Sequence, residues 1–125
     1  MIVAEPIYKF LLFIKRRPGM TPEEFQDYYE NVHSKLGKTI VPDVGAFKYV
    51  RRYIHPLAGS VDERAEDLEY DEITEVWFKD YEKFKAVAER VSRGELANEV
   101  EEDEAKFMDR TKTRFATVVE YEHTF

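Results

Sequence analysis

His33 is the residue whose type and placement best suit chemistry near neutral pH. It follows Tyr29 by one helical turn, near the predicted carboxyl end of a helix that begins at Pro22. The helix dipole favours the protonated imidazole at that end, so we expect the pKa of His33 to lie at or slightly above its usual value. Such a side chain can serve as a general base or acid. A surface histidine that caps helix carbonyls is the competing interpretation.

Glu75 and Asp109 are the carboxylates that could assist His33. Glu75 shares a predicted strand face with Trp77, where burial would raise its pKa. Close to His33 it would orient the imidazole, but an ion pair with Lys48 or with an arginine on a neighbouring strand is the more common role. Asp109 precedes the last predicted strand. A carboxylate there could hold a histidine, although capping of backbone amides is more usual.

Aromatic residues are numerous enough to line a pocket as well as a core. The chain has nine Phe and eight Tyr among 125 residues, and 43% of its residues are hydrophobic. Rings at strand and helix spacing usually belong to a core, so only part of them should contact a ligand. The candidates for binding an apolar or aromatic small-molecule substrate are Tyr28, Tyr29, Phe47, Tyr49, Tyr53 and Trp77.

A well-marked helix start precedes His33. Thr21 can cap the helix, Pro22 suits its first position, and Glu24 completes a capping box by reaching back to the cap amide. Apolar residues then recur at helical spacing. Gly37 predicts that this helix ends or breaks by that position.

The remaining elements follow from periodicity and punctuation. Strands are predicted over residues 7–15, 46–54, 71–79 and 114–121, and further helices over 81–93 and 95–108. Asp80 should cap the first of these helices and Gly94 should close it. Residues 55–70 are predicted to form a long loop, with a helical turn at 61–65.

The order βαββα(α)β predicts an α+β ferredoxin-like sandwich, one domain over residues 1–125. Both crossovers would cover the same face of the four-stranded sheet. We expect Phe47, Tyr49, Trp77 and Phe115 to leave apolar area on the other face. A homodimer that packs sheet against sheet would bury that area.

Composition disfavours several classes of function. A net charge of −7 argues against general affinity for nucleic acid or anionic membranes. The absence of cysteine and of a leader-like segment makes the cytoplasm the expected location. Three scattered histidines predict no metal site. Dinucleotide, nucleotide-phosphate and serine-hydrolase motifs are missing.

The segment from Lys15 to His33 resembles the EthD family of small dimeric α/β-barrel proteins. It contains Lys-Arg-x-Pro-Gly-Met-Thr, a helix with Phe and Tyr, and Asn-x-His. The later Phe-Met-Asp at 107–109 resembles an element near the end of many such chains. This resemblance implies a dimeric barrel and a histidine beside its cavity.

The resemblance implies a cofactor-independent enzyme that transfers protons on an aromatic or polyketide-like substrate, by decarboxylation, dehydration, cyclisation or isomerisation. A cofactor-free monooxygenase on the same barrel, and a non-catalytic ligand-binding accessory protein of a degradative pathway, are the alternatives. No cofactor is expected. Heme stays open, because relatives on this barrel include heme enzymes and His33 could be an axial ligand.

Overall fold

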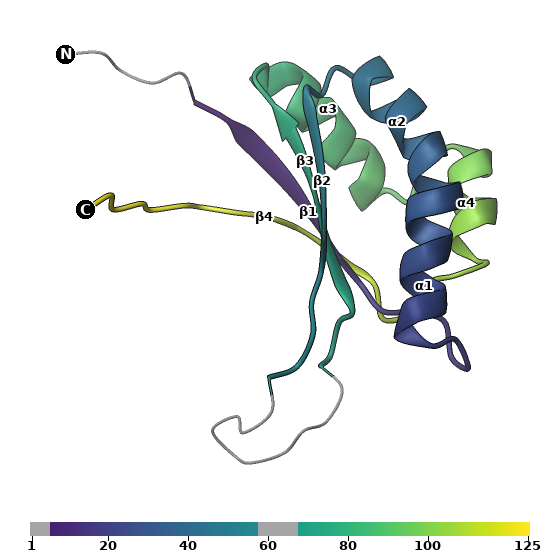
Figure 1. Ribbon diagram of the computed structural model, residues 1–125. Coiled ribbons are helices and arrows are strands. Elements are labelled where there is room, and N and C mark those ends of the chain that lie inside the picture. Colours follow the sequence, from purple (N-terminus) through teal and green to yellow (C-terminus); the bar gives the residue numbers. More distant parts are fainter. Residues whose placement is uncertain (1–5, 58–67) are drawn as a thin grey trace.

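The computed structural model describes residues 6–57 and 68–125, so the helical turn expected at 61–65 lies outside the described residues. A four-stranded antiparallel sheet carries the helices on one face, and the C-terminal end of the chain points away from the helices (Figure 1). The strands are β1 (Tyr8–Ile14), β2 (Lys48–Tyr53), β3 (Glu72–Phe78) and β4 (Arg114–Thr117), in the spatial order β2-β3-β1-β4. The helical elements are α1 (Pro22–Tyr28), η1 (Tyr29–His33), α2 (Ser34–Asp43), α3 (Tyr81–Ser92) and α4 (Asn98–Glu104). This order confirms the predicted ferredoxin-like α+β fold.

β1 is a central strand, as its two apolar faces predict. It pairs with β3 on one side and with β4 on the other. The register aligns Leu12 with Thr74 and Leu11 with Glu75. Because side chains alternate across a sheet, Leu12 and Thr74 share the helix-covered face, and Leu11 and Glu75 share the open face.

The first helical segment begins as predicted. The Thr21 hydroxyl accepts a hydrogen bond from the Glu24 amide, and the Glu24 carboxylate accepts one from the Thr21 amide. The predicted end at Gly37 is wrong, because α2 continues to Asp43. Gly37 serves close packing there, since a Cβ at this position would lie 2.8 Å from ring atoms of Tyr49.

A π-helical turn, η1, joins α1 to α2. The Ser34 amide donates to the carbonyl of Tyr29, five residues earlier. Tyr29 and His33 stand at the two ends of this turn, and both are buried. Single π-turns of this kind are frequent at functional sites.

The second half of the chain follows its predictions with shorter elements. Asp80 caps α3 by accepting from the Lys83 amide, and Gly94 ends it with a φ of 70°. α4 is confined to Asn98–Glu104, and β4 stops at Thr117.

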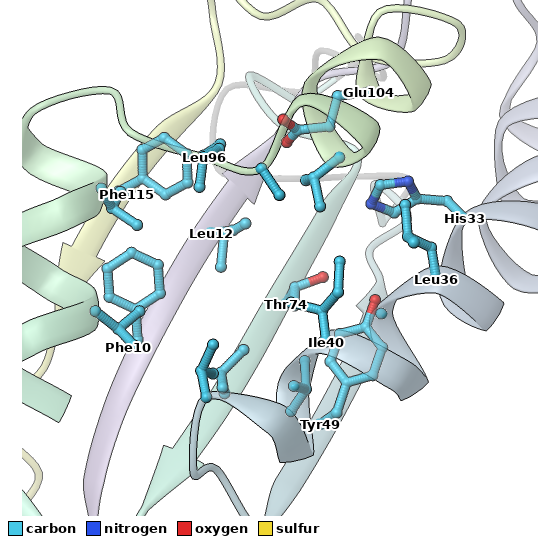
Figure 2. A pocket seen from close by; sticks show the side chains of 18 of the residues that line it. Phe10, Leu12, His33, Leu36, Ile40, Tyr49, Thr74, Leu96, Glu104 and Phe115 are labelled. Atoms are coloured by element: carbon cyan, nitrogen blue, oxygen red, sulfur yellow. The ribbon is translucent and has the colours of Figure 1, made fainter. Parts of the chain in front are cut away.

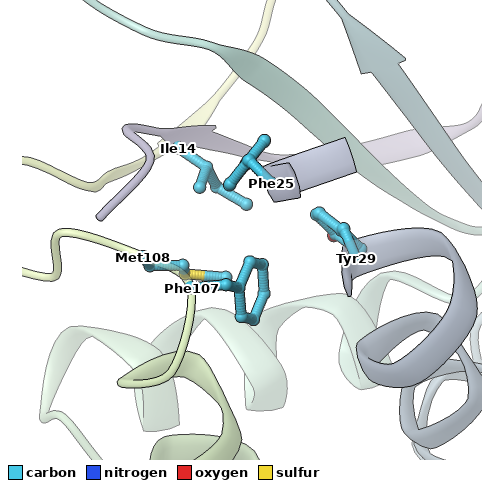
Figure 3. Packing of buried hydrophobic residues seen from close by; sticks show 5 residues of the cluster. All are labelled: Ile14, Phe25, Tyr29, Phe107 and Met108. Atoms are coloured by element: carbon cyan, nitrogen blue, oxygen red, sulfur yellow. The ribbon is translucent and has the colours of Figure 1, made fainter. Parts of the chain in front are cut away.

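The core lies where α1, β1 and the segment after α4 meet. Figure 3 shows the cluster, which consists of Ile14, Phe25, Tyr29, Phe107 and Met108. Phe107 packs against both Phe25 and Tyr29, with ring centroids 5.7 and 5.2 Å apart. This packing fixes the position of the chain that follows α4, and therefore of α4 itself, relative to the sheet.

Candidate active site

A cavity of about 180 Å³ lies between the helix-covered face of the sheet and the helices (Figure 2). Its wall is mostly apolar and includes Phe10, Leu12, Ile40, Val76, Leu96 and Phe115. The polar groups in the wall include His33, Tyr29, Tyr49, Thr74 and Glu104. An engineered cavity of about 150 Å³ binds benzene, so this space suits a ligand of one or two rings.

Asp103 of α4 holds the imidazole of His33. Its Oδ2 accepts a hydrogen bond from Nδ1 of His33 at 2.8 Å, and its Oδ1 accepts one from the Tyr28 hydroxyl at 2.6 Å. The Phe107 ring packs against the imidazole, with centroids 4.7 Å apart. These contacts fix the orientation of a ring that points from its helix into the cavity (Figure 2).

The protonation states of this pair follow from its surroundings. Burial would raise the pKa of Asp103, but the hydrogen bonds from Tyr28 and His33 lower it below its usual value. Asp103 is therefore a carboxylate near pH 7 and can only accept, so the proton of neutral His33 lies on Nδ1. Nε2 is then free to accept a proton. No group within residues 6–57 and 68–125 forms a hydrogen bond with Nε2.

Burial lowers the pKa of His33, and the hydrogen bond to Asp103 opposes this effect only in part. This differs from the expectation of a pKa at or above the usual value. The expectation assumed a solvated helix end, whereas His33 lies in the middle of a continuous helical segment and is only 7% exposed. At pH 7 the imidazole is mainly neutral, which is the state a general base requires.

A chain of hydroxyl groups leads from the cavity to a buried acid. The Tyr49 hydroxyl lies 3.1 Å from that of Tyr29, which lies 2.6 Å from the Thr74 hydroxyl. The Thr74 hydroxyl lies 2.6 and 2.8 Å from the two oxygens of Glu72, which is fully buried. Burial raises the pKa of Glu72 to about 8, so this carboxyl is mostly neutral at pH 7.

Glu75 lies on the opposite face of the sheet from the cavity. Its Oε2 pairs with Arg52 at 2.7 Å and accepts a hydrogen bond from the Trp77 indole at 3.1 Å. Burial acts to raise the pKa of Glu75, but these two hydrogen bonds lower it, contrary to the expected rise. The structure therefore does not bring Glu75 to His33, and the ion pair with a neighbouring arginine is observed.

Asp109 also lies apart from His33. It caps a turn, where its Oδ1 accepts from the amide and the hydroxyl of Thr111 at 3.1 and 2.6 Å. Hydrogen bonding to Thr111 lowers the pKa of Asp109. The capping role that the sequence favoured is the one observed.

The predicted ligand-binding rings divide between several places. Tyr29 and Tyr49 line the cavity, whereas Tyr28 binds Asp103 and Tyr53 binds Glu30 at 2.6 Å. The expectation that Tyr49 and Phe115 lie on the open face is wrong, because both line the cavity. Trp77 does lie on the open face, and Phe47 packs edge-on against it.

Three acidic residues around the cavity, Glu72, Asp103 and Glu104, were not predicted from the sequence. Asp103 and Glu104 belong to an acidic run that resembles a solvated surface. Their spacing was the available signal. Asp103 and Glu104 lie three and four residues after Val100 and precede Phe107, so they fall on the helix face that the apolar residues mark as buried. Glu72 gave no comparable signal.

The described residues contain no group of three or more His, Asp or Glu side chains that could hold a metal ion. Nε2 of His33 is available as an axial ligand, but a porphyrin is much larger than the cavity of about 180 Å³ that this nitrogen faces. The residues present therefore do not fit heme. None of the described helices is long and apolar enough to span a membrane.

Solved structures with the same arrangement of elements are known. An ethyl tert-butyl ether D (EthD) family protein from Bacillus halodurans matches with a TM-score of 0.57 at 16% identity, over 93% of this chain and 100% of that one. Protein At3g17210 from Arabidopsis thaliana matches with a TM-score of 0.53 at 16% identity, over 94% and 99% of the chains. A dimeric ferredoxin-like protein of unknown function from Thermobifida fusca gives 0.53 at 13% identity, over 90% and 89%. These likenesses show a ferredoxin-like fold.

The family follows from the sequence match. The model of the EthD domain matches residues 17–111, which is most of the chain. The protein therefore belongs to the EthD-domain family, as the segment from Lys15 to His33 indicated. No curated protein matches the chain.

Proposed function

We propose that this protein is a cofactor-independent enzyme that moves a proton on an apolar or aromatic small molecule bound in the cavity. The observation that supports this proposal is the placement of His33. Asp103 occupies its Nδ1, its Nε2 is open, and burial keeps the ring neutral beside an apolar space. Decarboxylation, dehydration, cyclisation and isomerisation all need such a base or its conjugate acid.

The hydroxyl chain supplies a second function in this proposal. Proton removal next to a carbonyl places negative charge on the carbonyl oxygen, which needs a hydrogen-bond donor. In the structure Thr74 donates to Glu72 and Tyr49 donates to Tyr29. When Glu72 is neutral its own proton can be donated to Thr74 instead, and the hydroxyl groups then rotate so that the Tyr49 hydrogen faces the cavity. His33 would act on the carbon–hydrogen bond while Tyr49 stabilises the oxyanion.

Exchange of acidic carbon-bound protons tests the proposal without knowledge of the natural substrate. 2-Tetralone is a two-ring ketone whose protons next to the carbonyl exchange in D₂O, as proton NMR detects. We expect the protein to accelerate this exchange above the buffer rate. His33→Gln should remove the acceleration, by about 100-fold or more, because general bases contribute factors of that size.

Glu75→Gln is the matched control, because it changes a carboxylate pair on the opposite face. It should leave the exchange rate unchanged. Exchange that His33→Gln retains would contradict the role of His33. Binding of 2-tetralone without accelerated exchange would instead favour the non-catalytic ligand-binding role.

We also propose that the protein forms a homodimer through the open face of the sheet. Within residues 6–57 and 68–125 no other element covers that face (Figure 1). It carries partly exposed apolar residues, among them Leu11, Phe13, Val50 and Ile73. A similar structure from Thermobifida fusca is described as dimeric. Sedimentation should give the mass of two chains, and Ile73→Asp should reduce it to that of one. A wild-type protein that sediments as one chain would contradict the dimer.

A further inference from the structure

Glu104 is a buried carboxyl group without a complete set of partners. It is the last residue of α4, is 3% exposed, and points into the cavity (Figure 2). Its Oε1 has no hydrogen-bond partner within the part of the chain that the structure describes. The preceding residue, Asp103, provides the contrast, because hydrogen bonds reach both of its oxygens.

The surroundings of Glu104 are unfavourable for a carboxyl group. The nearby wall of the cavity includes Leu12, Val100 and Met108. Burial raises the pKa of Glu104 to about 7; Arg110 opposes this rise, whereas Glu101 and Asp103 add to it. The other ionisable groups of the same wall are His33, Arg90, Glu95 and the two tyrosines Tyr29 and Tyr49.

Burial of a polar atom without a hydrogen bond is unfavourable, and an apolar side chain at this position would avoid that cost. The cost is offset when a bound molecule supplies the missing hydrogen bond. The Glu104 side chain and the His33 ring line the same cavity (Figure 2), so a ligand bound there lies against both residues.

We propose that Glu104 is a ligand-recognising residue, and that the ligand is an aromatic molecule with a hydroxyl group that donates a hydrogen bond to Oε1. This inference rests on the proposed function, because it takes the cavity to be the ligand site. It adds a specific requirement: the ligand presents an apolar ring to the cavity wall and a hydroxyl group to α4. A hydrocarbon of the same shape satisfies only the first condition.

p-Cresol and p-xylene are suitable probes, because they differ by a hydroxyl and a methyl group of similar size. Dissociation constants are measured by NMR from shifts of cavity residues such as Leu36, Ile40 and Val100. The quantity of interest is the ratio of the p-xylene constant to the p-cresol constant. We expect Glu104→Met to lower this ratio at least tenfold, and Glu104→Gln, which keeps an acceptor oxygen, to lower it less.

Glu102→Gln is the matched control on α4, because Glu102 is exposed and absent from the cavity wall. It should leave the ratio at the wild-type value. A ratio that Glu104→Met does not change would overturn the inference and leave the cavity as a ligand site. Failure of both probes to shift cavity residues would contradict the cavity itself, and with it the proposed function.

A measurement on the wild-type protein covers the case in which Glu104→Met does not fold. The carbon-13 signal of the Glu104 carboxyl reports its pKa with and without each probe. A donated hydrogen bond stabilises the carboxylate, so p-cresol should lower this pKa relative to p-xylene. Equal pKa values with the two probes would overturn the inference.

Discussion

Each face of the sheet carries a carboxylate that is bound to a nitrogen donor, and the two pairs differ in whether a reactive atom is left without a partner. On the helix-covered face, Asp103 binds His33 and leaves Nε2 open to a cavity. On the open face, Glu75 binds Arg52 and Trp77, and the ammonium groups of Lys9 and Lys48 lie 3.9 and 4.3 Å from the centroid of a Trp77 ring. Both pairs join a carboxylate to a nitrogen donor, but only the first leaves a reactive atom without a partner.

The difference comes from burial rather than from residue type. Within a single chain Arg52 is half exposed, so water reaches its pair with Glu75, and such pairs contribute little to the stability of the subunit. The polar groups under the helices are removed from water, so each depends on its particular partner. Substitutions on the two faces should therefore differ in effect.

Thr74→Val is expected to have the largest effect on stability. It removes the hydroxyl that links Tyr29 to Glu72 and leaves both without this partner. Loss of about 2 to 4 kcal/mol from the free energy of unfolding is expected, because buried groups lose their hydrogen bonds. Chemical denaturation measures this value, and a loss below about 1 kcal/mol would show that the buried chain does not differ from the open face.

Glu72→Gln sharpens the comparison through pH. The folded pKa of Glu72 is raised to about 8 from a usual value of 4.5. The raised pKa of Glu72 stabilises the folded state fully below pH 4.5. This stabilisation is lost as the pH rises toward 8, because over that range the unfolded state has released the Glu72 proton and the folded state still holds it. Wild-type stability should therefore fall by about 3 to 4 kcal/mol more than that of Glu72→Gln between pH 5 and pH 8.

Denaturation at a series of pH values checks this prediction. The remaining slope in Glu72→Gln should come partly from Glu104, whose pKa is raised to about 7. Parallel stability curves for the two proteins would mean that Glu72 is solvated in the folded state.

Asp103→Asn is expected to have a moderate effect on His33. Loss of the neighbouring negative charge should lower the pKa of His33 further, because Asp103 now acts to raise it. The exchange rate of 2-tetralone at pH 7 should fall about tenfold, and its pH profile should shift to lower pH. Glu102→Gln is the control on the same helix, and an unchanged profile in Asp103→Asn would remove Asp103 from the positioning of His33.

Glu75→Gln should have the smallest effect. It weakens a pair whose arginine is half exposed, so the free energy of unfolding should change by about 1 kcal/mol or less. Urea denaturation provides the measurement. A loss as large as that of Thr74→Val would remove the contrast between the two faces.

Local sequence signals predicted the fold well. The capping box at Thr21, the cap at Asp80 and the two-sided strand at residues 7–15 each depend on neighbours in the chain, and each is observed. The helix end at Gly37 was missed because its reason is tertiary: the glycine leaves room for the Tyr49 ring. A glycine in a helix and a glycine after one look alike in sequence.

The candidate site was predictable only in part. His33 was predicted from its residue type and from the resemblance of the segment from Lys15 to His33 to the EthD family. Its partner Asp103 lies 70 residues later in an acidic run and was not predicted. The π-turn at Tyr29–His33 has no marker in the sequence. Glu75 was misplaced because strand alternation shows which residues share a face but not which face the helices cover.

The state of His33 in the free protein tests the central claim most directly. Long-range proton–nitrogen NMR between pH 4 and pH 9 reports both the pKa and the position of the ring proton. We predict a pKa below 6.5, a neutral ring with its proton on Nδ1, and an Nε2 signal that shifts when 2-tetralone is added. A pKa at or above 6.5, or a proton on Nε2 in the neutral ring, would contradict a general base held by Asp103.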